Sequence, residues 1–172
     1  AKQILSGSPL PKAFGGFNTD VEYKGINLGF NFIYKIGGLL FDAGSRDVAE
    51  DGYYWERTRS YYGYQDAWTP DNPNALFPKI SGNDPEDGIL RTSRHLHNAT
   101  FLRLKNINLG YTFPAAILNK VRISGARVFF NGTNLVTLSK FKWADPEVNN
   151  YGSRGWETPF GKTYTFGIEV NF

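Results

Sequence analysis

The stretch KTYTFGIEVNF, residues 162–172, alternates between apolar side chains and small or polar ones. One set occupies the even positions: Tyr164, Phe166, Ile168, Val170 and Phe172. The other occupies the odd positions: Thr163, Thr165, Gly167, Glu169 and Asn171. Because a β-strand points successive side chains to opposite faces, the stretch predicts a strand with one apolar and one polar face.

The same alternation recurs and predicts strands over about residues 14–23, 26–43, 98–113, 122–138 and 162–172. Lys24-Gly25 between the first two is typical of a tight hairpin turn. The apolar parity switches near Lys105-Asn106, which indicates a bulge or a change of environment. In the fourth strand the alternation points three side chains outward: Ala126, Val128 and Phe130. An aromatic, Pro-rich connection follows the second strand, with a short helix expected near residues 46–59.

The connections between these strands alternate in length. The connection from Tyr23 to Ile26 is tight and that from Phe113 to Arg122 is short, whereas two are long, at about residues 44–97 and 139–161. Short turns at one end and long loops at the other are typical of outer-membrane barrels, whose sheet must close because lipid cannot satisfy backbone polar groups. The smallest such barrels have about eight strands. We therefore expect residues 1–172 to be the C-terminal part of a larger barrel; the alternative is a soluble β-sandwich.

Composition agrees with an all-β fold and excludes several kinds of chemistry. Aromatic residues make up 16% of the 172 residues, and there are 19 glycines. Cysteine is absent, so disulfides and thiolate catalysis are excluded. The net charge of +3 comes without a basic block, so no nucleic-acid partner is expected. No nucleophile-elbow, P-loop or zincin motif occurs; we expect no enzyme, no catalytic residue and no cofactor.

The long connections carry most of the exposed-looking aromatic residues. Rings with a polar tip suit sugar faces or a protein lid, and they also suit packing of a loop against itself. The candidates for substrate or lid contact are Tyr53, Tyr54, Trp55, Tyr61, Tyr62, Tyr64, Trp68, Trp143 and Trp156, with Tyr151 beside the last two.

Three groups of polar residues are candidates for metal or catalytic sites. The carboxylates Asp84, Glu86 and Asp87 lack the spacing of an EF-hand loop and favour a solvated turn. His95 and His97 lack a nearby set of further ligands and favour packing over metal binding. Asp145-Pro146-Glu147 favours a structural turn, so no metal site is expected.

Several segments resemble the SusC/RagA family of TonB-linked outer-membrane transporters. The likeness lies in LRLKNINLGYTFP at residues 102–114, NGTNL at 131–135, DPE at 145–147 and the closing strand at 160–172. GGF…YKG at 15–25 and WTPDNPNALFPKI at 68–80 are similar to family segments too. Each motif is weak alone, but their order and spacing together are specific.

The resemblance implies a Gram-negative outer-membrane barrel of about 22 strands around a plug, which this chain lacks. It implies TonB-dependent import of large nutrients, oligosaccharides or peptides. The implied partners are the rest of the transporter, a SusD-like surface lipoprotein, the TonB complex and outer-membrane lipid. A passive porin and a secreted carbohydrate-binding β-sandwich are the alternatives.

In a barrel the two faces of these strands have different roles. The polar side chains are expected to line the lumen or meet the plug: Asn27, Asn31, Thr163, Thr165 and Glu169. The apolar set of the last strand is expected to close the barrel by pairing with its first strand and to guide insertion: Tyr164, Phe166, Ile168, Val170 and Phe172.

Overall fold

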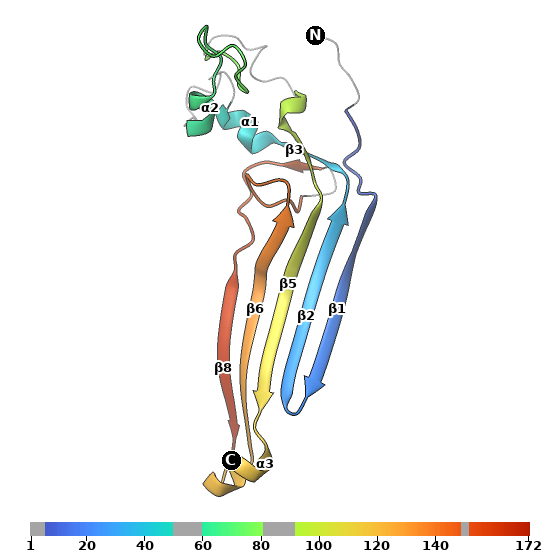
Figure 1. Cartoon of the computed structure of the whole chain (residues 1–172), viewed down its shortest axis with the longest axis vertical. Coiled ribbons are helices and arrows are strands. Elements are labelled where there is room, and N and C mark those ends of the chain that lie inside the picture. The colour runs from blue at the N-terminus through green and yellow to red at the C-terminus, as the bar shows by residue number, and fades with distance from the viewer. Residues whose placement is uncertain (1–5, 50–59, 81–91, 149–151) are drawn as a thin grey trace. The chain divides into compact units, whose positions relative to one another are not determined.

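The long amphipathic segments form one antiparallel sheet in the computed structural model, which describes residues 6–49, 60–80, 92–148 and 152–172. Its strands are β1 (Ala13–Tyr23), β2 (Ile26–Ile36), β5 (Phe101–Thr112), β6 (Gly125–Ser139) and β8 (Thr163–Asn171). They lie in the order β1-β2-β5-β6-β8 (Figure 1). The all-β, antiparallel prediction is therefore confirmed.

Tight connections join the strands at one end of this sheet. Lys24 and Gly25 both have positive φ, 48° and 83°, as a two-residue type I′ hairpin requires. Gly25 is also required by space, because a Cβ there would lie 2.5 Å from the Thr112 carbonyl oxygen. At the same end, Pro114 precedes a helical turn, α3 (Ala115–Leu118), and a 3-10 turn (Asn119–Val121).

The predicted bulge is present in β5. The register against β2 shifts between Asn31 and Phe32, and the register against β6 shifts between Leu104 and Asn106. An extra residue at this point moves the apolar set from even to odd positions. Leu102 and Leu104 therefore stay on the same face as Ile107 and Leu109.

Three predicted strands were too long, and the one expected over 98–113 spans only Phe101–Thr112. The strand expected over 26–43 ends at Ile36, because Gly37 and Gly38 have positive φ, 76° and 80°, which ends the ladder. Leu39–Asp42 instead forms β3 in a separate sheet of order β4-β3-β7, with β4 at Leu96–Asn98. The strand expected from 122 begins at Gly125, since Arg122 has a left-handed φ of 58°.

The second sheet belongs to another compact unit, made of Ala1–Leu10, Gly38–Asn98 and Val148–Thr158. This unit also holds β7 (Ser153–Arg154), α1 (Ala43–Ala49), α2 (Tyr61–Gln65) and a 3-10 turn (Ser93–His95). The helix expected near 46–59 corresponds to α1, which begins earlier; residues 50–59 lie outside the described residues. None of the helices in the described ranges is long and apolar enough to cross a membrane.

Candidate functional site

Cross-strand register brings the apolar positions of all five long strands onto one face. One row across the sheet reads Val21, Leu28, Leu109, Phe130 and Phe166. The next reads Tyr23, Ile26, Tyr111, Val128 and Ile168. Ala126, Val128 and Phe130, which were predicted to point outward together, lie on this face opposite Val170, Ile168 and Phe166.

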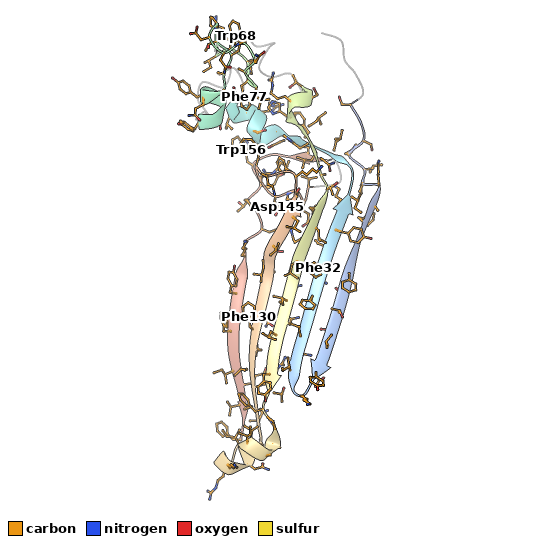
Figure 2. All side chains as sticks on the ribbon, viewed as in Figure 1. Phe32, Trp68, Phe77, Phe130, Asp145 and Trp156 are labelled. Carbon is orange, nitrogen blue, oxygen red and sulfur yellow. The ribbon has the colours of Figure 1, made fainter. Side chains whose placement is uncertain are left out.

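This apolar face is exposed rather than covered by a second layer. Phe166 is 77% exposed and Ile168 is 74% exposed, although both lie at the centre of β8. Figure 2 shows side chains such as Phe130 and Phe32 on the sheet without a covering layer. Exposed side chains of this face include Phe17, Val21, Tyr23, Ile26, Tyr34, Leu102, Leu109, Val128, Val136, Leu138, Tyr164 and Val170.

Contacts on the apolar face run sideways between neighbouring strands. The ring of Phe130 lies 4.9 Å from that of Phe166 and 6.5 Å from that of Tyr164. An open hollow of about 430 Å³ lies beside Phe130, lined by Ile26, Leu109, Gly110, Tyr111, Val128, Phe129 and Phe166. A contiguous apolar face that spans five strands is typical of a contact surface and not of an ordinary water-facing surface. The face is therefore built to meet an apolar medium or partner.

Amides and hydroxyls occupy the opposite face. One row reads Asn18, Asn31, Asn106, Thr133 and Thr163, and the amide of Asn31 donates a hydrogen bond to Asn18 Oδ1. Thr133 Oγ1 donates to Asn106 Oδ1 at 3.3 Å. The predicted polar positions Asn27, Asn31, Thr163, Thr165 and Glu169 all lie on this face.

Arg103 forms a buried ionic cluster on the polar face, which we call the Arg103 clamp. Its side chain, 1% exposed, donates to Asp145 Oδ1 at 2.5 Å and to Glu147 Oε2 at 2.9 Å. Its Nε donates to Thr137 Oγ1 at 3.1 Å. Such charge-assisted bonds fix geometry as well as energy. The clamp therefore ties the segment after β6 to the wall of the sheet.

Aromatic rings complete the clamp. The Arg103 guanidinium lies 5.4 Å from the centroid of Phe101 and 5.3 Å from that of Phe160. Lys105 Nζ lies 4.9 Å from the same Phe160 ring. Since Phe160 precedes β8 and Arg103 lies on β5, Phe160 reaches back across β6. Asn134 Nδ2 helps to fix this approach by donating to the Gly161 carbonyl at 3.3 Å.

The sequence analysis identified the carboxylate turn of this cluster but not its arginine. It interpreted Asp145-Pro146-Glu147 as a structural turn, which agrees with the hydrogen bond from Glu147 N to Asp145 Oδ1 at 2.9 Å. It did not single out Arg103. The available signal was an arginine flanked by Leu102 and Leu104 in a strand, which needs a carboxylate partner if buried.

The aromatic loop candidates are divided between the two units. Tyr61, Tyr64 and Trp68 are exposed, and Tyr62 belongs to α2. Trp156 lies in the same unit as these residues and Trp143 in the other, and both are exposed. Tyr53, Tyr54, Trp55 and Tyr151, like Asp84, Glu86 and Asp87, lie outside the described residues.

The segment around Trp68 is held by its own hydrogen bonds. Trp68 N donates to the Phe77 carbonyl at 2.9 Å, and Phe77 N donates to the Asp66 carbonyl at 3.1 Å. Asp66 Oδ2 accepts from Leu76 N at 3.1 Å. A hollow of about 430 Å³, the size of small-ligand sites, is lined by Tyr64, Gln65, Ala67, Trp68, Thr69, Pro70, Asn72, Lys79 and Ile80. The structure thus brings Tyr64 and Trp68 to one concave surface.

His97 lies on β4 of the smaller sheet, near the charge of Asp42, and His95 ends the 3-10 turn that precedes β4. His95 is buried; its Nδ1 lies 3.2 Å from Ser45 Oγ, and its ring packs edge-on against Phe41 at 6.2 Å. Burial lowers the pKa of His97, helped by the charge of His95 and opposed by that of Asp42. The described residues contain no group of three or more potential metal ligands. The packing interpretation of His95 is supported.

No family model matches the chain. Among curated proteins, the chain is 29% identical to TonB-dependent receptor P26 of Formosa agariphila, covering 98% of this chain and 18% of that protein. It is 25% identical to TonB-dependent receptor SusC of Bacteroides thetaiotaomicron, covering 91% of this chain and 15% of that protein. Both of these relatives are TonB-dependent receptors.

The chain also matches solved structures of the RagAB importer. The chain matches a structure of the RagAB peptide importer in the open-open state with a TM-score of 0.78 and 31% identity. That match covers 98% of this chain and 18% of the other. A structure of the RagAB peptide transporter matches with a TM-score of 0.79. The sheet is therefore a partial barrel, and the chain spans less than a fifth of these relatives.

An amphipathic antiparallel sheet and relatives that match nearly its whole length agree with the likeness found in the motifs: the chain belongs to the SusC/RagA family of TonB-dependent receptors.

Proposed function

We propose that this chain forms the C-terminal wall of an outer-membrane barrel that imports large nutrients with energy relayed by TonB. The observation that carries the proposal is the exposed apolar face, on which Phe166 and Ile168 are 77% and 74% exposed. Lipid is an apolar medium that accepts such a face, provided that all backbone groups are paired within a closed sheet. A β-sandwich would instead bury this face against a second sheet.

The polar face of the sheet then lines the lumen or meets the plug. The ladder of Asn and Thr side chains supports this role, since these groups hydrogen-bond water, protein or solute alike. The Arg103 clamp holds the 140–147 segment on this side, which narrows the lumen beside β5 and β6. The last strand, with Tyr164, Phe166, Ile168, Val170 and Phe172, closes the barrel against strands of the rest of the transporter.

The exposed loop aromatics contact the solute or the lid. A SusD-like lipoprotein is the lid, and the hollow beside Trp68 is a candidate contact for either one. Its aromatic and proline lining, with the amides of Gln65 and Asn72, suits sugar rings and peptides alike. The solute class is thus an oligosaccharide or a peptide.

Uptake by cells that express the full-length protein tests this function. Labelled glycans and oligopeptides of several lengths are offered to cells with and without a working TonB complex. We expect saturable uptake of one class that is lost without TonB. Uptake that persists without TonB would contradict the proposal and favour the passive porin.

A further inference from the structure

Both tight connections of the sheet carry cations and no carboxylate. Lys24 lies in the turn between β1 and β2, and Lys120 and Arg122 lie between β5 and β6. The two connections are at the same end of the sheet, since Thr112 N donates to the Gly25 carbonyl at 2.8 Å (Figure 1). This end of the sheet is therefore locally positive; we call Lys24, Lys120 and Arg122 the cationic rim.

Two of these cations occupy backbone positions that suit other residues better. Lys24 has a φ of 48° and Arg122 a φ of 58°, in the left-handed region that favours Gly, Asn or Asp. Asn134 is the third non-glycine residue with positive φ in the described part of the chain. A strained backbone with a charged side chain at both connections points to a role for the charge itself.

The charge of the rim is not neutralised within the described residues. Lys24, Lys120 and Arg122 are exposed, and none of them forms an ion pair there. The side-chain carboxylates of this end, Glu22 and Glu169, project from the polar face of the sheet, where Glu169 lies 4.0 Å from Arg127. The α-carboxylate of Phe172 also lies at this end (Figure 1) but forms no ion pair with a described residue. The rim is thus available to an external anion.

Aromatic side chains lie between the rim and the apolar face. Lys24 Nζ lies 5.1 Å from the ring centroid of Tyr23, which belongs to the apolar face. Tyr111 packs edge-on against Phe113 at 5.0 Å, and Ile117 in α3 is exposed. Tyr side chains at this position are typical of the membrane interface, and cations just beyond them reach the level of lipid phosphates.

We propose that the cationic rim binds the head groups of anionic phospholipids in the leaflet at the short-connection end of the barrel. Positive charge that forms no ion pair with a described carboxylate and adjoins a lipid-facing surface is complementary to those head groups. The binding rests on the proposed membrane-wall role and goes beyond it, because an apolar face alone does not choose between zwitterionic and anionic lipid.

The test uses the full-length transporter in nanodiscs of phosphatidylethanolamine with or without phosphatidylglycerol. Native mass spectrometry counts the phosphatidylglycerol molecules retained on the released protein. Wild type is compared with Lys24→Gln/Lys120→Gln/Arg122→Gln, and with Lys79→Gln/Lys140→Gln/Lys142→Gln as a control of equal charge in the long segments. We expect about tenfold weaker phosphatidylglycerol retention in the rim variant alone.

A salt titration of the wild type gives a second readout that needs no variant. Retention of phosphatidylglycerol, but not of phosphatidylethanolamine, should fall as salt rises. Equal retention in wild type and rim variant, or equal loss in the control variant, would overturn the proposal. Displacement of the lipid by millimolar inorganic phosphate would also overturn it, by indicating a free-phosphate site. If the wild type enters nanodiscs but shows no lipid preference, the result contradicts this inference alone. If it fails to enter a bilayer, the result contradicts the proposed function as well.

Discussion

At the scale of single residues, burial distinguishes an arginine that holds the structure together from one that faces solvent. Arg103 and Arg127 both lie on the polar face of the sheet. Arg103 is 1% exposed and touches two carboxylates, whereas Arg127 is 42% exposed and lies 4.0 Å from Glu169. Because Arg103 is buried, loss of its contacts with the two carboxylates is costly for stability. Solvent screens the Arg127–Glu169 pair, so its loss is nearly neutral for stability.

We expect Arg103→Met to destabilise the full-length protein by about 2 kcal/mol or more, because Asp145 and Glu147 lose their shared cation. The expected cost stays below that of a fully buried pair because the Glu147 side chain is 36% exposed. Arg127→Met is the matched control and should cost less than about 0.5 kcal/mol. Urea unfolding in lipid vesicles measures both variants, and equal costs would contradict the clamp.

The lowered pKa of His97 predicts that the smaller sheet weakens in acid. Burial is the main cause, so the folded state binds the proton less readily than the unfolded state does. Stability is therefore full above the unfolded pKa of about 6.5 and falls as the pH drops below it. His97→Gln should flatten this dependence. Amide protection factors of β3 and β4, corrected for intrinsic exchange, measure it; an unchanged acid response in the variant would refute the assignment.

At the scale of elements, periodicity predicted the long strands well. It gave the hairpin at Lys24-Gly25, the bulge near Lys105 and the face on which each side chain of β8 lies, because these depend on local parity and turn chemistry. It did not give β3, β4 or the Arg103 clamp. Pairing of short strands, and of Arg103 with Asp145, depends on chain segments brought together by the fold, which local patterns do not encode.

Two lysine variants of β8, one on each face of the strand, test whether lipid or water covers the apolar face. Ile168→Lys should reduce the folded, heat-resistant barrel and cost about 1 kcal/mol, because the charge enters hydrocarbon close to the row of Tyr23 and Tyr111, where the cost is smaller than at the bilayer midplane. Thr165→Lys, on the opposite face of the same strand, should be tolerated. Urea unfolding and gel mobility of the full-length protein report both. Since Ile168 is 74% exposed, near-neutral behaviour of both variants would indicate that water covers this face.

At the scale of the whole molecule, the sheet is a partial barrel, which we propose to be one section of a longer wall. Its two edge strands are β1 and β8, and the chain covers 18% of the RagAB chain that it matches. In the function proposed above, import, lid binding and coupling to TonB require the assembled transporter. What this section contributes is two surfaces of opposite polarity on one layer of strands.

The central claim is that the apolar face touches lipid, and a spin-label accessibility scan along β8 tests it most directly. Single nitroxides are placed at residues 163–170 of the full-length protein in outer-membrane vesicles. We predict high accessibility to oxygen at Tyr164, Phe166, Ile168 and Val170, and low accessibility to a water-soluble nickel reagent at these positions, with the reverse at the alternate residues. Equal accessibility along the strand, or preference for the nickel reagent at Phe166 and Ile168, would contradict the account.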